Sequence, residues 1–234
     1  MFRKLWKIIS RLAITFVLLS FAWVLLYKWV PVMWTPLMLK RTVQNIEQKD
    51  YHISHIWVDI EDIAPVMVRA VIASEDGKFM SHRGFDIKEL YWMLNDSVTK
   101  GKKIRGCSTI SQQVAKNCFT FCERSWWRKA FETYYTVLIE LFWSKERIME
   151  VYLNVAETGK GLFGVEAASQ KYFNCSAAQL NIHQAVSIAC VLPNPYIRNP
   201  KTVSQKNQKR YNTTYKRTEI TRYPFKFPIS SFER

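Results

Sequence analysis

Glycine, proline and cysteine are scarce in this sequence: its 234 residues contain seven, eight and five of them, respectively. So little glycine and proline excludes collagen-like and low-complexity chains. A hydrophobic content of 48% is enough to bury a core. The length allows one domain of ordinary size, with room for an anchor or a tail.

The five cysteines, Cys107, Cys118, Cys122, Cys175 and Cys190, are odd in number and irregularly spaced. This pattern excludes a disulfide framework. Cys118 and Cys122 are one helical turn apart, but no second pair of Cys or His accompanies them, so they are a weak signal for zinc. We expect small buried residues with at most one incidental bridge.

Acidic residues are nearly absent from three parts of the chain. Residues 1–30 contain five basic residues and no acidic one, residues 100–129 contain eight and one, and residues 201–234 contain nine and two. The net charge of +15 would suit nucleic acid, anionic lipid or an anionic substrate. Nucleic-acid proteins are more often basic across their whole domain, so we expect no nucleic-acid partner.

Residues 12–30 form a long apolar run that only Thr15, Ser20 and Lys28 interrupt. As a helix the run would be about 28 Å long, close to the thickness of the hydrocarbon core of a bilayer. Four basic residues precede it, which places the N-terminus in the cytoplasm. No small-residue cleavage site follows, so we expect an uncleaved single-pass anchor. A buried helix of a soluble domain is the alternative.

The chain divides into a cytoplasmic tip and anchor (1–30), a connecting helix or linker (31–52), a domain (53–200) and a basic C-terminal tail (201–234). The domain reads as mostly helical, with helices over 64–74 and 180–192 and two within 126–156 that break near 142–144. Thr109 and Gln112 have the spacing of a capping box, which predicts a helix start. No alternation of strands and helices is visible, which argues against a parallel α/β sheet.

Two adjacent carboxylates, Glu75 and Asp76, stand at the end of the apolar helix predicted over 64–74. Acidic side chains are unfavourable at a helix C-terminus because they oppose the helix dipole. A partly buried carboxylate has a raised pKa and can act as a base or an acid. A solvated turn is the alternative explanation.

A second group of charged residues lies on predicted helices. Arg128 and Glu132 share a face, with Lys129 adjacent, which could also be an ordinary surface ion pair. Thr109, Gln113 and Lys116 share a polar face at i, i+4 and i+7. Together with Arg124 they make a cationic, hydrogen-bonding lining that suits pyrophosphate.

Two short patterns are coincidental. Gly159, Gly161 and Gly164 have the spacing of a dinucleotide-binding loop, but they follow a helix rather than a strand. Ser97 and Lys100 have the spacing of penicillin-binding serine enzymes, but no K-T-G sequence follows. We expect no organic cofactor.

Five ordered segments resemble the motifs of the peptidoglycan glycosyltransferases, the glycosyltransferase domain of class A penicillin-binding proteins. They are residues 70–86, 106–117, 124–140, 145–165 and 184–200. The resemblance implies a mostly α, lysozyme-like domain on the outer face of the cytoplasmic (inner) membrane. After Pro200 the family commonly has another amphipathic helix, where this sequence is polar and poorly patterned.

The resemblance also implies a reaction, the polymerisation of lipid II into glycan strands with inversion and release of undecaprenyl pyrophosphate. Glu75 would be the catalytic base and Glu132 the second catalytic acid. The expected partners are lipid II, the growing lipid-linked glycan chain, the membrane and other cell-wall synthesis proteins. A divalent cation, Mg²⁺ or Mn²⁺, could accompany the pyrophosphate, with Glu132 as a candidate ligand.

The residues expected to bind the substrate lie in the first three motifs. They are Asp76, Phe79, His82, Ser108, Thr109, Gln112, Gln113, Lys116, Asn117, Arg124, Arg128 and Lys129. The amphipathic stretch 85–93 is expected to enter the membrane interface and admit the lipid. A lytic transglycosylase or muramidase, a catalytically silent tethered binding protein and a nucleic-acid binder are the rival classes.

Overall fold

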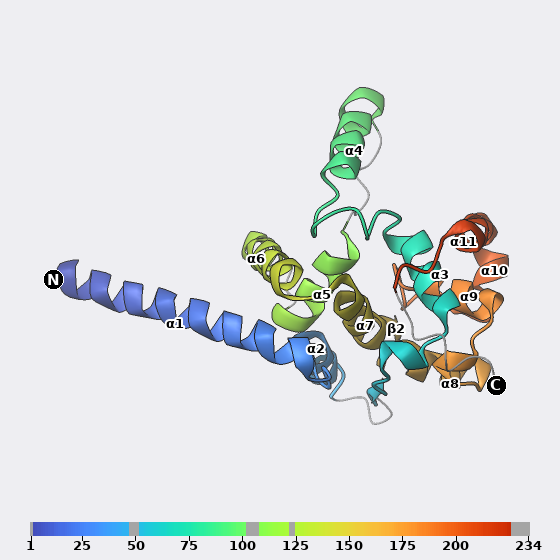
Figure 1. Ribbon diagram of the computed structural model, residues 1–234, viewed down its shortest axis with the longest axis horizontal. Helices are drawn as coiled ribbons and strands as arrows, with labels where there is room; N and C mark the ends of the chain where they lie inside the picture. Colours follow the sequence, from blue (N-terminus) through green and yellow to red (C-terminus); the bar gives the residue numbers. More distant parts are fainter. Residues whose placement is uncertain (1, 47–51, 102–107, 122–124, 226–234) are drawn as a thin grey trace.

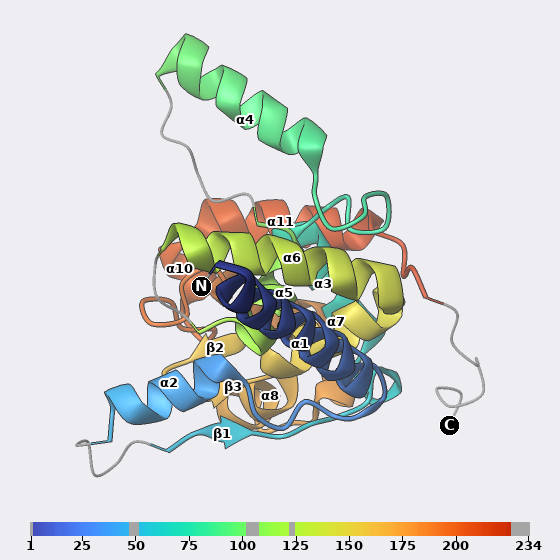
Figure 2. The ribbon, with the colours of Figure 1, turned by 90° about the vertical axis from the view of Figure 1, so that its left-hand side faces the viewer.

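The computed structural model describes residues 2–46, 52–101, 108–121 and 125–225. These residues are mostly helical, with a small three-stranded sheet (Figures 1 and 2). The helices are α1 (Phe2–Trp29), α2 (Pro36–Gln44), α3 (Pro65–Glu75), α4 (Ile87–Lys100), α5 (Ile110–Phe119), α6 (Trp126–Phe142), α7 (Lys145–Val155), α8 (Val165–Phe173), α9 (Ile182–Val191), α10 (Val203–Lys206) and α11 (Gln208–Ile220), with short 3₁₀ turns at Ile60–Asp62 and Ala177–Gln179.

The core is built around helices that are apolar on most of their surface. In α3, Met67, Val68, Ala70, Val71 and Ile72 are buried, because a helix that is hydrophobic nearly all round must be covered on several sides. Helix α3 packs against α9 and α11, and α5 packs against α6 and α7. In contrast, α1 and α4 project from this body (Figure 1).

The helix boundaries follow local signals in the sequence. Pro65 occupies the first turn of α3, and the predicted capping box of Thr109 and Gln112 begins α5. The predicted break near 142–144 separates α6 from α7, where the Ser144 hydroxyl accepts from the Arg147 amide. Helix α9 begins after Asn181, slightly later than expected, because that side chain caps its first turn.

The sheet was not predicted. Its order is β1 (Ser54–His55), β3 (Leu162–Phe163), β2 (Glu157–Gly159), with β1 parallel and β2 antiparallel to β3. Strands of two or three residues are too short to produce a visible alternation. The glycine triplet lies here, and Gly164 follows β3 at φ +83°, where a Cβ would lie 2.6 Å from the Asn154 carbonyl oxygen. These glycines therefore shape a tight turn.

Among the described residues, Cys118, Cys175 and Cys190 are free thiols. Cys118 and Cys190 are fully buried, as small core residues should be. Cys107 and Cys122 lie outside the described residues, so the expectation of at most one bridge stays a prediction for them.

Helix α1 is long and apolar enough to span a membrane, with a mean hydropathy of 2.1 over its most apolar stretch. It begins at Phe2, ten residues before the apolar run, and most of its surface is exposed. These properties fit a single membrane anchor.

The C-terminal end of α1 is part of the packed body. The Trp143 indole nitrogen donates to the Val24 carbonyl oxygen at 2.9 Å. The Arg147 guanidinium donates to the carbonyl oxygens of Tyr27 at 2.8 Å and Val30 at 2.6 Å. The end of α1 and the residue after it are therefore hydrogen-bonded to the body of the domain.

Residues assigned to a tail in the sequence analysis form α10 and α11. Helix α11 packs against α3 and α9, and its Thr214 and Thr218 are buried. The sequence gave no clear amphipathic pattern here because threonine and tyrosine, rather than aliphatic residues, cover the core.

We expect deletion of residues 2–30 to destabilise the domain by about 3 kcal/mol relative to deletion of residues 2–18. The longer deletion removes carbonyl acceptors from Trp143 and from the charged Arg147, whose hydrogen bonds are each worth roughly 1–3 kcal/mol. Denaturant unfolding of both proteins in the same detergent measures the difference. Equal stability would show that the end of α1 is only loosely attached.

Candidate active site

A cleft of about 550 Å³ lies among α2, α5, α6, α7, β2 and the segment after α9. This size is within the roughly 300–1,000 Å³ typical of ligand sites. Its lining residues are Leu37, Arg41, Ser108, Gln113, Lys116, Asn117, Arg128, Lys129, Glu132, Tyr152, Ala156, Glu157, Leu192, Pro193, Asn194, Pro195 and Tyr196.

Glu75, the last residue of α3, is not among the residues that line the cleft, but it is hydrogen-bonded to Gln113, which is. The Gln113 amide nitrogen donates to its Oε2 at 3.2 Å, and Arg210 of α11 donates to its Oε1 at 3.0 Å. Only 9% of its side chain is exposed. Burial raises the pKa of Glu75, although the Gln113 hydrogen bond and the Arg210 charge lower it. The Glu75 carboxylate thus binds a proton more readily than an exposed glutamate does.

Gln113 joins Glu75 to the wall of the cleft. The hydroxyl of Tyr152 donates to the Gln113 side-chain oxygen at 3.4 Å, and both residues line the cleft. Burial, reinforced by the nearby Glu75 and Asp76 charges, raises the pKa of Tyr152 well above its ordinary value. Tyr152 therefore remains a neutral donor that fixes the Gln113 amide. Tyr152 is not among the site residues that the sequence analysis predicted.

Glu132 and two cations form a compact group on α6. Arg128 donates to its Oε2 at 2.8 Å and Lys129 to its Oε1 at 2.5 Å. The Glu132 side chain is 3% exposed, and all three residues line the cleft. Because both carboxylate oxygens are engaged, Glu132 is well placed to orient the cations.

Helix α5 supplies the facing wall, with Gln113, Lys116 and Asn117 lining the cleft and Ser108 just before the helix. Among the described residues no donor reaches the buried Asn117 side-chain oxygen. A buried acceptor without a partner is costly, so a ligand donor would stabilise it. Of the polar face predicted on this helix, Gln113 and Lys116 line the same cleft as Arg128 and Lys129, whereas Thr109 does not.

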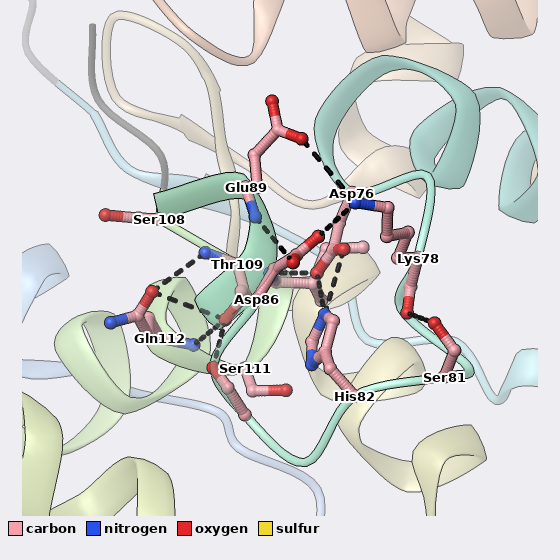
Figure 3. A network of polar contacts seen from close by, with 12 residues as sticks. Asp76, Lys78, Ser81, His82, Asp86, Glu89, Ser108, Thr109, Ser111 and Gln112 are labelled. Atoms are coloured by element: carbon pink, nitrogen blue, oxygen red, sulfur yellow. Dashed lines mark hydrogen bonds and ion pairs between the residues drawn. The ribbon is translucent and has the colours of Figure 1, made fainter. Parts of the chain in front are cut away.

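Asp76 organises a network behind the cleft rather than within it (Figure 3). Both its carboxylate oxygens lie 3.0 Å from the His82 Nε2, and its Oδ2 accepts from the Ile110 amide at 3.0 Å. A carboxylate is favoured at this first turn of α5, where free amides and the helix dipole attract negative charge. Asp76 thus fixes the end of α3 to the start of α5.

Thr109 and Gln112 belong to the same structural network. The Thr109 hydroxyl donates to the Gly84 carbonyl oxygen at 2.6 Å, and the Gln112 side chain accepts from the Thr109 amide at 3.0 Å. Phe79 is fully buried beneath the Lys145 ammonium, 4.5 Å from its ring centre. None of these three side chains is in the cleft lining. Their predicted contact with substrate, like that of Asp76 and His82, stays a prediction.

Arg124, the remaining predicted site residue, lies outside the described residues. Conversely, Arg210 was missed because it falls in the stretch assigned to a tail. The signal for the helix that carries Arg210 is one helical face made of Tyr211, Thr214, Tyr215 and Thr218. Thr214 and Thr218 of this face are buried. Recognising polar residues as a buried stripe would have predicted α11, although not the contact with Glu75.

Within the described residues, no three His, Cys, Asp or Glu side chains gather as metal ligands. Glu132 is a single carboxylate whose oxygens already accept from Arg128 and Lys129. Mg²⁺ requires octahedral oxygen coordination. The described side chains therefore do not form a divalent-cation site on their own.

Comparison with known proteins identifies the family. A family model described as Transglycosylase matches residues 40–219. The biosynthetic peptidoglycan transglycosylase of Bdellovibrio bacteriovorus is 48% identical over 198 residues, covering 82% of this chain and 79% of that protein. The protein of the same name from Bacteroides thetaiotaomicron is 47% identical over 194 residues, covering 82% of this chain and 78% of that protein. The one from Haemophilus influenzae is 44% identical over 197 residues, covering 83% of this chain and 79% of that protein.

The mostly helical fold thus has a polar cleft with the Glu132, Arg128 and Lys129 group in its wall, and a buried carboxylate, Glu75, bonded to Gln113 of that wall. The chain belongs to the transglycosylase family. The expected fold class, a mostly α, lysozyme-like domain with one N-terminal apolar helix, is confirmed.

We expect Arg210→Gln to raise the pKa of Glu75 further, because the charge of Arg210 lowers it in the native protein. Arg210→Lys, which keeps the charge, should raise it less. A carboxyl-carbon NMR titration of both variants measures the shifts. Lys209→Gln is the matched control, since Lys209 neighbours Arg210 on α11 and is not among the groups that shift the pKa of Glu75. An unchanged pKa in Arg210→Gln would show that the ion pair does not influence Glu75.

Proposed function

We propose that this protein polymerises lipid II into the glycan strands of peptidoglycan. The observation that carries the proposal is the pairing of a buried carboxylate, Glu75, with a separate carboxylate–cation group, Glu132 with Arg128 and Lys129, around one cleft of a transglycosylase domain. The curated relatives are named for peptidoglycan biosynthesis, which supports the same assignment.

In this proposal Glu75 is the general base. It removes the proton from the 4-hydroxyl of the acceptor lipid II while that oxygen attacks the anomeric carbon of the growing chain. Its raised pKa suits proton transfer, since a base is most effective when its pKa is near the working pH. Gln113 and Arg210 would hold the carboxylate in place during the attack.

The cations would stabilise the leaving group. As the anomeric C–O bond breaks, negative charge grows on the undecaprenyl pyrophosphate, and inversion follows from attack on the opposite face. Lys116, Arg128 and Lys129 line the cleft where such charge can be offset. Glu132, the second acidic residue of the proposed site, would orient Arg128 and Lys129 toward the pyrophosphate. Arg124 is expected to join them.

A divalent cation, Mg²⁺ or Mn²⁺, bound with the pyrophosphate remains a separate proposal. Since the described side chains do not form a metal site, the phosphate oxygens of the substrate would have to provide most of its ligands.

The apolar helix α1 supports a location for the enzyme. Helix α1 would cross the cytoplasmic membrane with its N-terminus in the cytoplasm, which leaves the domain on the outer face beside the lipid-linked substrate. Helix α4 has no buried residue and exposes Ile87, Tyr91 and Trp92, which suits contact with the membrane interface (Figure 2). Other cell-wall synthesis proteins are the expected partners.

We expect Glu75→Gln to abolish polymerisation in a protein that still folds. The amide is nearly isosteric but cannot accept the proton, and loss of general-base catalysis typically costs ~10²–10⁴-fold. Turnover of labelled lipid II, alongside circular dichroism of the variant, measures both properties. More than a tenth of wild-type activity in the folded variant would exclude Glu75 as the base, and cleavage of preformed glycan by the wild type would indicate a lytic enzyme instead.

Lys116→Ala and Arg128→Ala should each lower turnover by about one to two decades, because charge-assisted contacts are worth roughly 1.5–3 kcal/mol. Lys216→Ala is the control, since Lys216 is exposed on α11 and does not line the cleft. Steady-state rates with labelled lipid II compare the three. Equal losses in all three would mean that the basic residues only attract anionic lipid.

A further inference from the structure

The Gln113 side chain contacts the proposed base, and the orientation of its amide group decides what it offers to that base. The amide nitrogen donates to the Glu75 Oε2 at 3.2 Å and to the Ser108 carbonyl oxygen at 3.5 Å. The amide oxygen accepts from the Tyr152 hydroxyl at 3.4 Å. We infer that Tyr152 is a positioning residue, which acts through Gln113 to keep an amide donor rather than an amide oxygen against Glu75. The inference rests on the proposed function, in which Glu75 is the base.

The two carboxylate oxygens of Glu75 have different partners. Oε1 accepts from Arg210 at 3.0 Å and from the Ser74 hydroxyl at 3.3 Å. Oε2 accepts from Gln113, which lines the cleft. Each oxygen of an ionised carboxylate has about two lone pairs that can accept. With one of them engaged by the Gln113 amide, Oε2 can still take the proton of an acceptor hydroxyl that approaches from the cleft.

Inversion of the Gln113 amide would remove this arrangement. A half turn of the group would bring its oxygen against the Glu75 Oε2 and the Ser108 carbonyl oxygen, and two acceptors form no hydrogen bond. A protonated Glu75 could instead donate to the inverted amide oxygen. A hydrogen bond to the neutral form of a carboxyl group raises its pKa. The inverted amide would therefore stabilise a protonated Glu75, which cannot act as a base.

Tyr152 is suited to prevent this inversion because its position and its proton are both fixed. It lies on α7 and is 1% exposed, so its ring has little freedom to move. Burial, reinforced by the Glu75 and Asp76 charges, raises the pKa of Tyr152, so the hydroxyl keeps its proton. Inversion of Gln113 would take away the oxygen that accepts this proton. A buried donor that loses its acceptor is costly, so the hydroxyl favours the native amide.

The charged groups around Glu75 are not altered when the Tyr152 hydroxyl is removed. Arg210 on α11 and Arg198 after α9 lower the pKa of Glu75 by their charge, and Asp76 follows Glu75 in the chain. All three keep their charge when Tyr152 is replaced by phenylalanine. A change in the pKa of Glu75 in that variant would therefore report on the hydrogen bonds of the amide.

The test compares Tyr152→Phe with the wild-type full-length protein in detergent. The substitution removes one oxygen atom and keeps the ring, so the fold should be retained. A carboxyl-carbon NMR titration should place the pKa of Glu75 about half a unit to one unit higher in the variant, as expected from one hydrogen bond. The acid limb of kcat/KM for lipid II should move up by the same amount, because it reports the free enzyme.

The pH dependence separates positioning from a loss of structure. At a fixed pH on the acid limb, kcat/KM should be about three- to tenfold lower in Tyr152→Phe, because less of Glu75 is ionised. At higher pH, where Glu75 is ionised in both proteins, the values should agree within about twofold. Tyr135→Phe is the matched control, because Tyr135 is a buried tyrosine of α6 that stacks on Phe119 and does not line the cleft.

A double-mutant cycle shows whether Tyr152 acts through the amide. Once Gln113→Ala has removed the amide, Tyr152→Phe should shift the pKa of Glu75 no further, since residues that act through a shared partner are not additive. The NMR titration measures this pKa without turnover, so it can be read even if Gln113→Ala is inactive.

Four results would overturn the inference: an unchanged Glu75 pKa in Tyr152→Phe, the same shift in Tyr135→Phe, a full shift in the Gln113→Ala background, or a loss of kcat/KM that is equal at every pH. The titration also separates this inference from the proposed function. A Glu75 that shifts as expected in a protein that does not polymerise lipid II would contradict only the proposed function. Polymerisation with an unshifted Glu75 in Tyr152→Phe would contradict only the role of Tyr152.

Discussion

The whole site depends on one buried carboxylate and on how it is held. Glu75 ends α3, but its two oxygens are fixed by Gln113 from α5 and Arg210 from α11. Three helices that are distant in sequence must therefore pack correctly before the carboxylate is in position. Burial alone would favour the protonated form of Glu75. The Gln113 amide and the Arg210 guanidinium partly offset this effect because they favour the charged form. With these opposing effects, the Glu75 carboxyl group can both accept a proton and release it.

The neighbouring carboxylate, Asp76, has a structural role. Asp76 is also buried, but its oxygens accept from His82 and from the first turn of α5, so it is occupied by the structure itself. Two adjacent acidic residues of the same helix end thus divide their roles by environment. Asp76 joins the end of α3 to the first turn of α5, the helix that carries Gln113.

Much of this arrangement could be predicted from local patterns. The apolar face of α3, the capping box of α5 and the spacing of Arg128, Lys129 and Glu132 each depend on residues only a few positions apart. The pairing of β1 with β3, the ion pair of Arg210 with Glu75 and the contact of Arg41 with Glu157 could not be predicted, because they join segments separated by about a hundred residues or more. Helix α11 was missed for a different reason, since its buried face consists of threonine and tyrosine rather than aliphatic residues.

The attachment of α1 to the domain has a mechanical consequence. Trp143 and Arg147 take three backbone carbonyl groups at the end of the anchor as acceptors, so the last turns of α1 and the start of α7 form one rigid piece. The domain therefore does not rotate freely about the end of α1. If α1 has a fixed depth and tilt in the bilayer, the height and the orientation of the cleft relative to the lipid surface are fixed as well. An attached helix therefore sets the orientation of the cleft relative to the membrane, which a flexible tether would not do.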